Sequence, residues 1–197
     1  TNLVESIAGQ VAVSLEKEYY QEELIKRERE LTLINRLSGV VASSLNIQEV
    51  YDTFINGLRE TIDINFATIA LIDAEELYIS VSTTEVGALW NIGDRIPLRG
   101  TATEWVVKNK KSLIEDDLSR DRMFPTGDEY LKRGIRSIVY LPLIVKGTGI
   151  GSLIIASKRP KAYSNEQASL LERLTSQIAA SIDNAQLYAK AEQRARI

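Results

Sequence analysis

The side chains of this sequence that could supply acid–base chemistry are carboxylates and lysines, and three carboxylates stand together at Glu115, Asp116 and Asp117. Two carboxylates that face each other can act as general acid and general base. Three consecutive residues, however, do not share one face of a helix or a strand. The run therefore favours a solvated loop after a strand, and we expect a protein without catalytic residues.

Two residue types with rich chemistry are absent, because the sequence contains no cysteine and no histidine. Without cysteine there is no disulfide framework, no thiolate nucleophile and no cysteine-held iron–sulfur cluster. Without histidine, imidazole-bound zinc, haem ligation by histidine and serine–histidine or cysteine–histidine catalysis are excluded. We therefore expect neither a metal site nor one of the familiar catalytic centres.

The composition indicates one domain with helical extensions. The chain has 197 residues, of which 44% are hydrophobic, which is enough for one buried core. Its net charge of −3 offers no excess of positive charge to phosphates, so we expect no nucleic acid and no anionic membrane as a partner. No apolar run approaches the roughly 20 residues that cross a bilayer, and no signal peptide is visible. We expect a cytoplasmic protein.

A long helix is predicted before the main domain. Residues 3, 7, 11 and 15 are apolar at helical spacing, and neither glycine nor proline occurs from residue 10 to residue 38. We interpret residues 16–45 as a connector helix with coiled-coil character. Its thin apolar seam needs a partner helix, which predicts a homodimer; the alternative is that the seam lies against the following domain. The seam consists of Leu24, Leu31, Ile34, Leu37 and Val41.

Residues 46–182 are predicted to form an α+β domain with an antiparallel sheet. Asn46 and Glu49 mark the start of a helix. Two hairpins follow, FATIALID with LYISVST and RSIVYLPLIV with GIGSLIIAS. The glycines of GTGIG lie between two strands, so they indicate a hairpin turn and not a nucleotide-binding loop. An irregular crossover with a helix over 101–108 separates the hairpins, and a helix capped by Ser164 and Gln167 ends the domain.

Four stretches of the chain resemble the GAF domains of bacterial signalling proteins: NFATIALID, GTATEWVVKNKKSLIEDDLSRDRMF, RGIRSIVYLPLIVKGTGIGSLIIAS and YSNEQASLLERLTSQIAASIDNAQLY. The resemblance covers residues 31–188. It implies a GAF (PAS-like) fold, with a central antiparallel sheet of about five or six strands, helices on one face and the crossover on the other. It also implies a sensory module in a signal-transduction protein, such as the sensor histidine kinase of a two-component system or a cyclic-dinucleotide enzyme.

In this family a ligand, when there is one, lies between the sheet and the crossover. On this resemblance the candidate pocket residues are Thr68, Thr101, Ala102, Trp105, Arg136 and Tyr140. For Trp105 and Tyr140 the alternative role, core packing, is favoured, and for Arg136 a salt bridge with Asp116 or Asp117 is favoured over facing the pocket. Outside this set, the aromatic residue of VGALWNIGD, Trp90, is either a lid or a surface cover.

The resemblance also limits the cofactor. Family members that bind bilins commonly use a cysteine, haem-binding members use a histidine, and the methionine-sulfoxide reductase branch uses a cysteine, whereas this chain has neither residue. The cyclic-nucleotide branch carries Asn-Lys, Phe and Asp-Glu, where this chain has Ser157-Lys158, Tyr163 and Glu166-Gln167. We expect no bilin, haem or cyclic nucleotide, and therefore no cofactor; another small molecule, or no ligand at all, remains.

The helix of the crossover argues against an anionic ligand. Thr101 and Glu104 predict a capping box at its start. Such a box occupies backbone donors and places a carboxylate where a phosphate would bind. An anion would therefore be repelled.

The start of the chain repeats a pattern found near its end. Residues 3–15, LVESIAGQVAVSL, match residues 170–182, LLERLTSQIAASI, with identities at Leu3/Leu170, Glu5/Glu172, Gln10/Gln177, Ala12/Ala179 and Ser14/Ser181. We interpret residues 1–15 as the last helix of a preceding GAF-like module, residues 46–182 as a GAF domain and residues 183–197 as the start of a C-terminal signalling helix. The alternative is shared composition between two amphipathic helices.

These observations predict a non-catalytic regulatory module. It would dimerise through its flanking helices, adjoin another GAF module and an output domain, and bind a small ligand between sheet and crossover. The alternative is a ligand-free dimerisation and relay spacer in a tandem array. A pocket with free space supports sensing, whereas one filled by side chains supports the spacer.

Overall fold

The computed structural model of the chain describes residues 2–41, 46–84 and 89–195, and the side chains of 33, 34, 36–41, 84 and 195 lie outside the description. The chain divides into two compact units, Thr1–Arg36 and Leu37–Ile197. Within the described residues, no helix is both long enough and apolar enough to cross a membrane.

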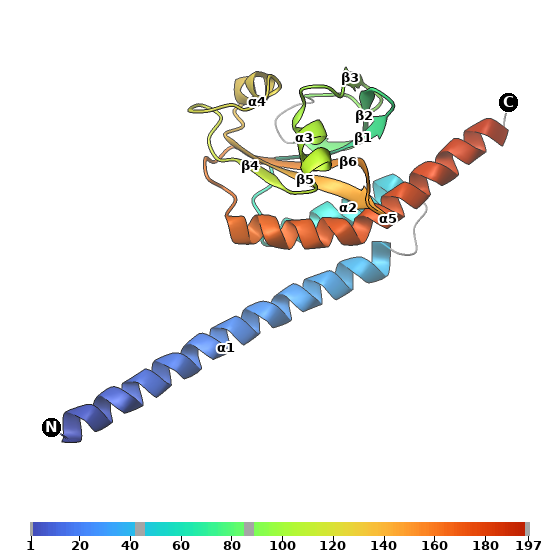
Figure 1. Cartoon of the computed structure of the whole chain (residues 1–197). Coiled ribbons are helices and arrows are strands. Elements are labelled where there is room, and N and C mark those ends of the chain that lie inside the picture. Colours follow the sequence, from blue (N-terminus) through green and yellow to red (C-terminus); the bar gives the residue numbers. More distant parts are fainter. Residues whose placement is uncertain (1, 42–45, 85–88, 196–197) are drawn as a thin grey trace. The chain divides into compact units, whose positions relative to one another are not determined.

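The first unit consists of most of helix α1, Asn2–Val41 (Figure 1). The helix continues without a break through the predicted boundary at residue 16, because its charged middle part has favourable pairs one turn apart, such as Glu23 with Arg27 at 3.0 Å. Two residues of the predicted seam, Leu24 and Leu31, are exposed. The side chains of the other three, Ile34, Leu37 and Val41, lie outside the described residues.

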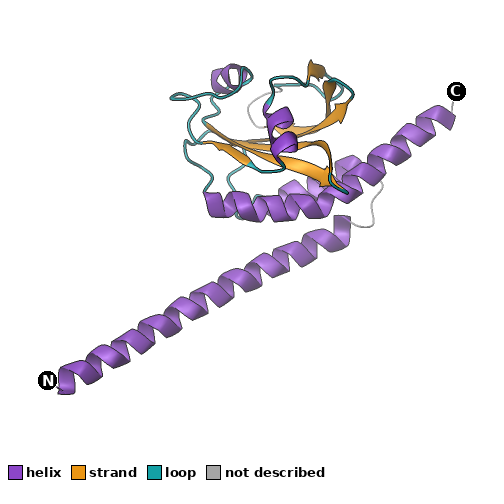
Figure 2. Cartoon of the chain, viewed as in Figure 1, coloured by secondary structure: helices purple, strands orange, loops and turns teal. Residues whose placement is uncertain are grey.

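The second unit is built on one six-stranded antiparallel sheet (Figure 2). The strands lie in the order β3-β2-β1-β6-β5-β4, and the two predicted hairpins, β1 with β2 and β5 with β6, meet at β1 and β6 in its centre. The strands are β1 Phe66–Asp73, β2 Glu76–Thr84, β3 Arg95–Pro97, β4 Leu113–Glu115, β5 Ser137–Val145 and β6 Thr148–Ser157. The predicted α+β fold with an antiparallel sheet is confirmed.

Helices cover both faces of the sheet (Figure 1). Helix α2, Ile47–Leu58, and helix α5, Asn165–Ala195, pack against each other and on one face, α5 mainly on β5. Helix α3, Ala102–Asn109, packs on β5 and β6 from the other face. The crossover between β2 and β5, which also contains the short helix α4, Gly127–Lys132, therefore forms the wall opposite α5.

Local chemistry sets the ends of these elements. The Asn46 side chain accepts a hydrogen bond from the Gln48 amide at 2.9 Å, and Ser164 and Gln167 exchange two bonds at 3.0 and 3.2 Å before α5. The β5–β6 turn has positive φ at both Lys146 and Gly147, as a tight hairpin turn requires. The predicted caps and the predicted turn are confirmed.

Candidate functional site

The candidate site lies between the sheet and the crossover, where α3 begins. The Thr101 hydroxyl accepts a hydrogen bond from the Glu104 amide at 3.2 Å, and the Glu104 carboxylate accepts one from the Gly100 amide at 2.7 Å. The predicted capping box is therefore present, with the carboxylate bonded to Gly100 and not to Thr101 itself. The negative charge lies at the positive end of the α3 dipole, where an anionic ligand would otherwise be attracted.

A cavity of about 20 Å³ lies at this place, which is room for about one water molecule. Four of the predicted pocket residues line it, namely Thr68, Thr101, Ala102 and Tyr140. The remaining wall is formed by Ala70, Leu77, Ile79, Trp90, Ile96, Thr103, Thr126, Tyr130 and Ile154. The site is thus filled by the chain's own side chains.

The hydroxyl groups of three predicted pocket residues already donate hydrogen bonds to the protein. Thr68 donates to the Val81 carbonyl at 2.7 Å, and Thr101 donates to the Leu98 carbonyl at 2.7 Å. Tyr140 donates to a Glu115 carboxylate oxygen at 2.7 Å. Because each hydroxyl has a single hydrogen to donate, none of the three is left as a donor for a bound molecule.

Two predicted pocket residues lie elsewhere. Trp105 lines a separate surface hollow of about 870 Å³ together with Lys111, Lys161 and Glu172. The Arg136 guanidinium forms two hydrogen bonds to the Asp117 carboxylate, at 3.0 and 3.1 Å, and one to the Ser119 hydroxyl at 2.9 Å. Of the two interpretations of Arg136, the structure therefore shows the ion pair, with Asp117 as the partner. The Ser119 hydrogen bond and this guanidinium hold the pKa of Asp117 below its usual range.

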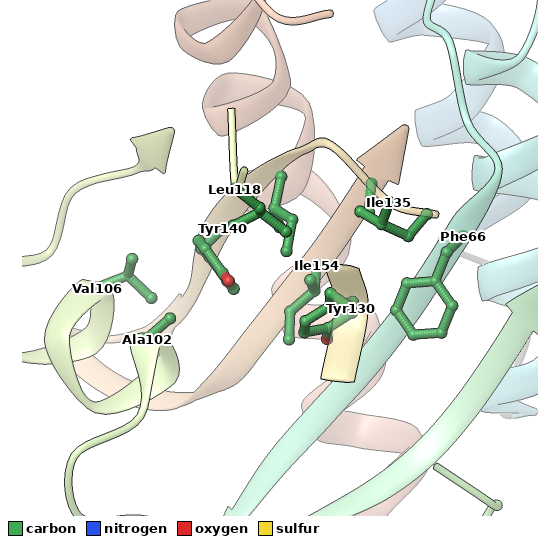
Figure 3. Packing of buried hydrophobic residues seen from close by; sticks show 10 residues of the cluster. Phe66, Ala102, Val106, Leu118, Tyr130, Ile135, Tyr140 and Ile154 are labelled. Carbon is green, nitrogen blue, oxygen red and sulfur yellow. The ribbon is translucent and has the colours of Figure 1, made fainter. Parts of the chain in front are cut away.

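Aromatic side chains belong to the buried cluster that adjoins the cavity, and Figure 3 shows Phe66, Tyr130 and Tyr140 within this cluster. Tyr130, from α4, packs edge-on against Phe66 of β1 with ring centroids 5.5 Å apart. Phe124 packs in the same manner against Tyr140 at 6.0 Å. Trp90 contributes to the cavity wall, as a lid would, and its indole is hydrogen-bonded to Tyr130. Sequence reasoning missed Tyr130, because the polar stretch around it gave no signal for a helix.

The expectation that the acidic run forms a solvated loop is wrong for Glu115. This residue ends β4, which pairs with β5, and it is only 5% exposed. One carboxylate oxygen accepts a hydrogen bond from the Tyr140 hydroxyl, and the other accepts a hydrogen bond from the Met123 amide at 2.7 Å. A tyrosine in the middle of an otherwise aliphatic strand was the available signal, because a buried phenol needs a hydrogen-bond partner.

Burial sets the ionisation of four of the eight tyrosines, Tyr51, Tyr130, Tyr140 and Tyr163. Burial raises the pKa of Tyr51 to about 12, and it also raises the pKa of Tyr130, Tyr140 and Tyr163 well above the usual value of a phenol. At Tyr140 the neighbouring Tyr130 and Glu115 add to the effect.

A pH dependence follows from these four phenols. A phenol whose pKa is raised by folding stays protonated in the folded chain while the unfolded chain loses its proton, so stability falls as pH rises above about 10. We expect ultraviolet difference titration to show that the phenols of these four buried tyrosines lose their protons only as the protein unfolds. Ionisation of all four buried phenols near pH 10 in the folded protein would contradict the described burial.

Comparison with known proteins identifies the family. The model of the GAF domain family matches residues 44–183. The chain belongs to the GAF domain family. A GAF domain is typically a regulatory or sensory part of a signalling protein, although some proteins of this fold are enzymes.

One curated protein shows a sequence relationship over most of this GAF chain. The formate hydrogenlyase transcriptional activator FhlA of Escherichia coli is 24% identical over 173 residues, which cover 84% of this chain and 25% of FhlA. The chain therefore spans about a quarter of that protein's length.

Solved structures share the GAF fold at lower identity. The GAF domain of an Acinetobacter phosphoenolpyruvate-protein phosphotransferase superposes with a TM-score of 0.66 at 17% identity, covering 82% of this chain and 98% of that one. A sensor histidine kinase GAF domain from Bacillus halodurans gives 0.62 at 23%, covering 71% and 95%. Free methionine-R-sulfoxide reductase from Neisseria meningitidis gives 0.65 at 16%, covering 81% and 91%. At these identities the likeness concerns the fold.

Proposed function

We propose that this chain is a non-catalytic regulatory GAF module of a multi-domain bacterial signalling protein, in which it relays a conformational change between its flanking helices. The relationship to a transcriptional activator and the shared fold with a histidine kinase GAF domain support a signalling context. The observation that carries the relay role is the cavity of about 20 Å³, which leaves no room for an organic ligand.

A catalytic role has little support in the residues that the structure describes. The Glu115 carboxylate is bonded to Tyr140 and to the Met123 amide, and Asp117 is bonded to Arg136 and Ser119. Within the described part of the chain, no cluster of three or more acidic residues is placed to hold a metal ion. Glu115 and Asp117, two of the three carboxylates that the sequence singled out, therefore serve the fold.

Ligand sensing is the second candidate function. Trp90 and Tyr130 come from the crossover and not from the sheet, so their displacement would enlarge the cavity without breaking a strand pair. The ligand would be small and uncharged or cationic, because Glu104 caps α3 at this site. It would also have to supply the hydrogen-bond donors itself, since the three hydroxyls discussed above donate within the protein.

The relay requires a partner for α1, and we propose that this partner is the same helix of a second chain. Leu24 and Leu31 lie seven residues apart and are 65% and 58% exposed, so they occupy the same side of the helix at the spacing of a coiled-coil seam. Charged residues such as Glu23 and Arg27 flank them. A helix exposing so thin an apolar stripe is stabilised by pairing with another helix.

Sedimentation equilibrium of the whole chain tests this dimer. We expect a dimer at tens of micromolar, and we expect the double variant Leu24→Asp/Leu31→Asp to be monomeric, because it places four carboxylates in the interface of two chains. The single variant Arg29→Asp is the matched control, since it lowers the net charge by the same two units on the other side of the helix and should leave the dimer intact. A monomeric parent chain, or a double variant that still dimerises, would contradict the proposal.

A further inference from the structure

The first half of α1 exposes a second apolar surface, separate from the seam at Leu24 and Leu31. Its five large apolar side chains are 51% to 74% exposed, and they recur at intervals of one, three or four residues, so they share one side of the helix. They are Leu3, Val4, Ile7, Val11 and Leu15. We call these five residues the N-terminal face.

The N-terminal face has a counterpart inside the GAF module itself. Aligning residues 3–15 with residues 170–182 pairs Val4, Ile7, Val11 and Leu15 with α5 residues that are at most 1% exposed. These counterparts are Leu171, Leu174, Ile178 and Ile182, and they belong to the side of α5 that packs on β5 and α2. In α5 these positions are covered by the sheet and by α2, whereas the matching positions in residues 3–15 are exposed.

The smaller and polar residues of the two segments agree as well. Ala12 matches Ala179, which is fully buried and leaves room for close packing. Glu5 matches Glu172, whose carboxylate accepts a hydrogen bond from the Ser112 hydroxyl beside β4 at 2.9 Å. Ala8 stands where α5 has Thr175, whose buried hydroxyl has no hydrogen-bond partner. Ala8, which has no hydroxyl to satisfy, therefore suits a buried apolar environment better than Thr175 does.

We infer that residues 3–15 of α1 dock on the sheet of a second GAF-type module, in the way that α5 docks on β5 and α2. The partner surface is the apolar face of an antiparallel sheet, with a hydroxyl at its edge to meet Glu5 as Ser112 meets Glu172. The corresponding sheet face of another copy of this chain already carries α5. The occupant is therefore a different module of the same fold, and the inference is independent of any ligand.

Exchanging the segments tests the inference in the whole chain. In the graft, residues 170–182 are replaced by the sequence of residues 3–15. In a reduced graft only the buried positions change, through Leu171→Val, Leu174→Ile, Thr175→Ala, Ile178→Val and Ile182→Leu. We expect both to unfold cooperatively in thermal melts, with Tm lowered by roughly 5–15 °C, because the buried exchanges remove only two methylene groups and the methyl and hydroxyl groups of Thr175 from the core.

In the matched control, residues 170–182 are replaced by the sequence of residues 5–17 instead. This shift of two residues turns the apolar side by about 200° and introduces Thr175→Gln and Ile182→Lys at buried positions. The control should lose the cooperative transition. The inference is overturned if the reduced graft has no cooperative transition, or if the control is as stable as the graft. A folded reduced graft beside an unfolded full graft would still support docking, since it assigns the failure to the three exposed exchanges Arg173→Ser, Ser176→Gly and Ala180→Val.

Discussion

Replacing Gly151 with alanine is expected to destabilise the GAF module severely. A Cβ atom at this position would collide with the Ala70 carbonyl oxygen and lie 2.9 Å from Leu71 Cα on the adjacent strand β1. Both neighbours are backbone atoms in the centre of the sheet, so no change of rotamer relieves the clash. We expect a loss of about 4 kcal/mol or more, a large part of the stability of a typical domain, measured by thermal or urea unfolding.

The neighbouring Gly149 provides the matched control. A Cβ atom there would meet the side chain of Val107 on α3, including its Cβ at 3.0 Å. Gly149→Ala should therefore cost about 1–3 kcal/mol, and adding Val107→Ala should restore most of it. Truncating side chains around Gly151 should give no such rescue. A Gly151→Ala variant that melts like the parent would show that β1 and β6 are not paired as described.

Tyr140→Phe is expected to lower the free energy of unfolding by about 2 kcal/mol. It removes the hydroxyl that donates to Glu115 and leaves a carboxylate oxygen without that donor at a residue that is 5% exposed. An unsatisfied charged group in a protein interior costs more than the loss of a hydrogen bond between neutral groups. Urea unfolding at neutral pH measures the loss.

A second tyrosine variant distinguishes two effects: the loss of a hydrogen bond to a carboxylate, and the loss of a hydrogen bond to an uncharged group. The Tyr51 hydroxyl donates to the uncharged Ala67 carbonyl at 2.6 Å, so Tyr51→Phe should cost about 1 kcal/mol. In a Glu115→Leu background, the cost of Tyr140→Phe should fall toward zero, because no carboxylate is left unpaired. Equal losses for Tyr140→Phe in both backgrounds would contradict a stabilising bond between Tyr140 and Glu115.

Much of the fold could be predicted because local sequence patterns determine most of its helices and strands. Strand patterns and helix caps depend only on residues close by in the sequence. This holds for the β-branched runs of β1, β2, β5 and β6 and for the capping side chains of Asn46, Thr101 and Ser164. The elements whose bounds the sequence did not indicate are short and depend on distant partners. Strand β4 has three residues and exists through its pairing with β5, where Leu113 lies opposite Tyr140, and α4 is a helix of six residues within a polar loop.

The candidate site was predictable only in part for the same reason. Thr68, Thr101, Ala102 and Tyr140 do line one cavity, because they come from elements whose order the sequence pattern indicated. The residue that helps to close this cavity, Tyr130, comes from the short helix that had no signal. Whether a pocket is open or filled depends on how side chains from distant segments pack together, which no single segment of the sequence specifies.

Native mass spectrometry of the whole chain, before and after denaturation in acid, tests the proposed relay most directly. It measures the number of chains and any retained small molecule in the same sample. The account predicts a homodimer with twice the mass of the chain and no additional molecule, since the cavity of about 20 Å³ holds no more than about one water. A monomer at tens of micromolar, or a dimer that releases an organic molecule on denaturation, would contradict it.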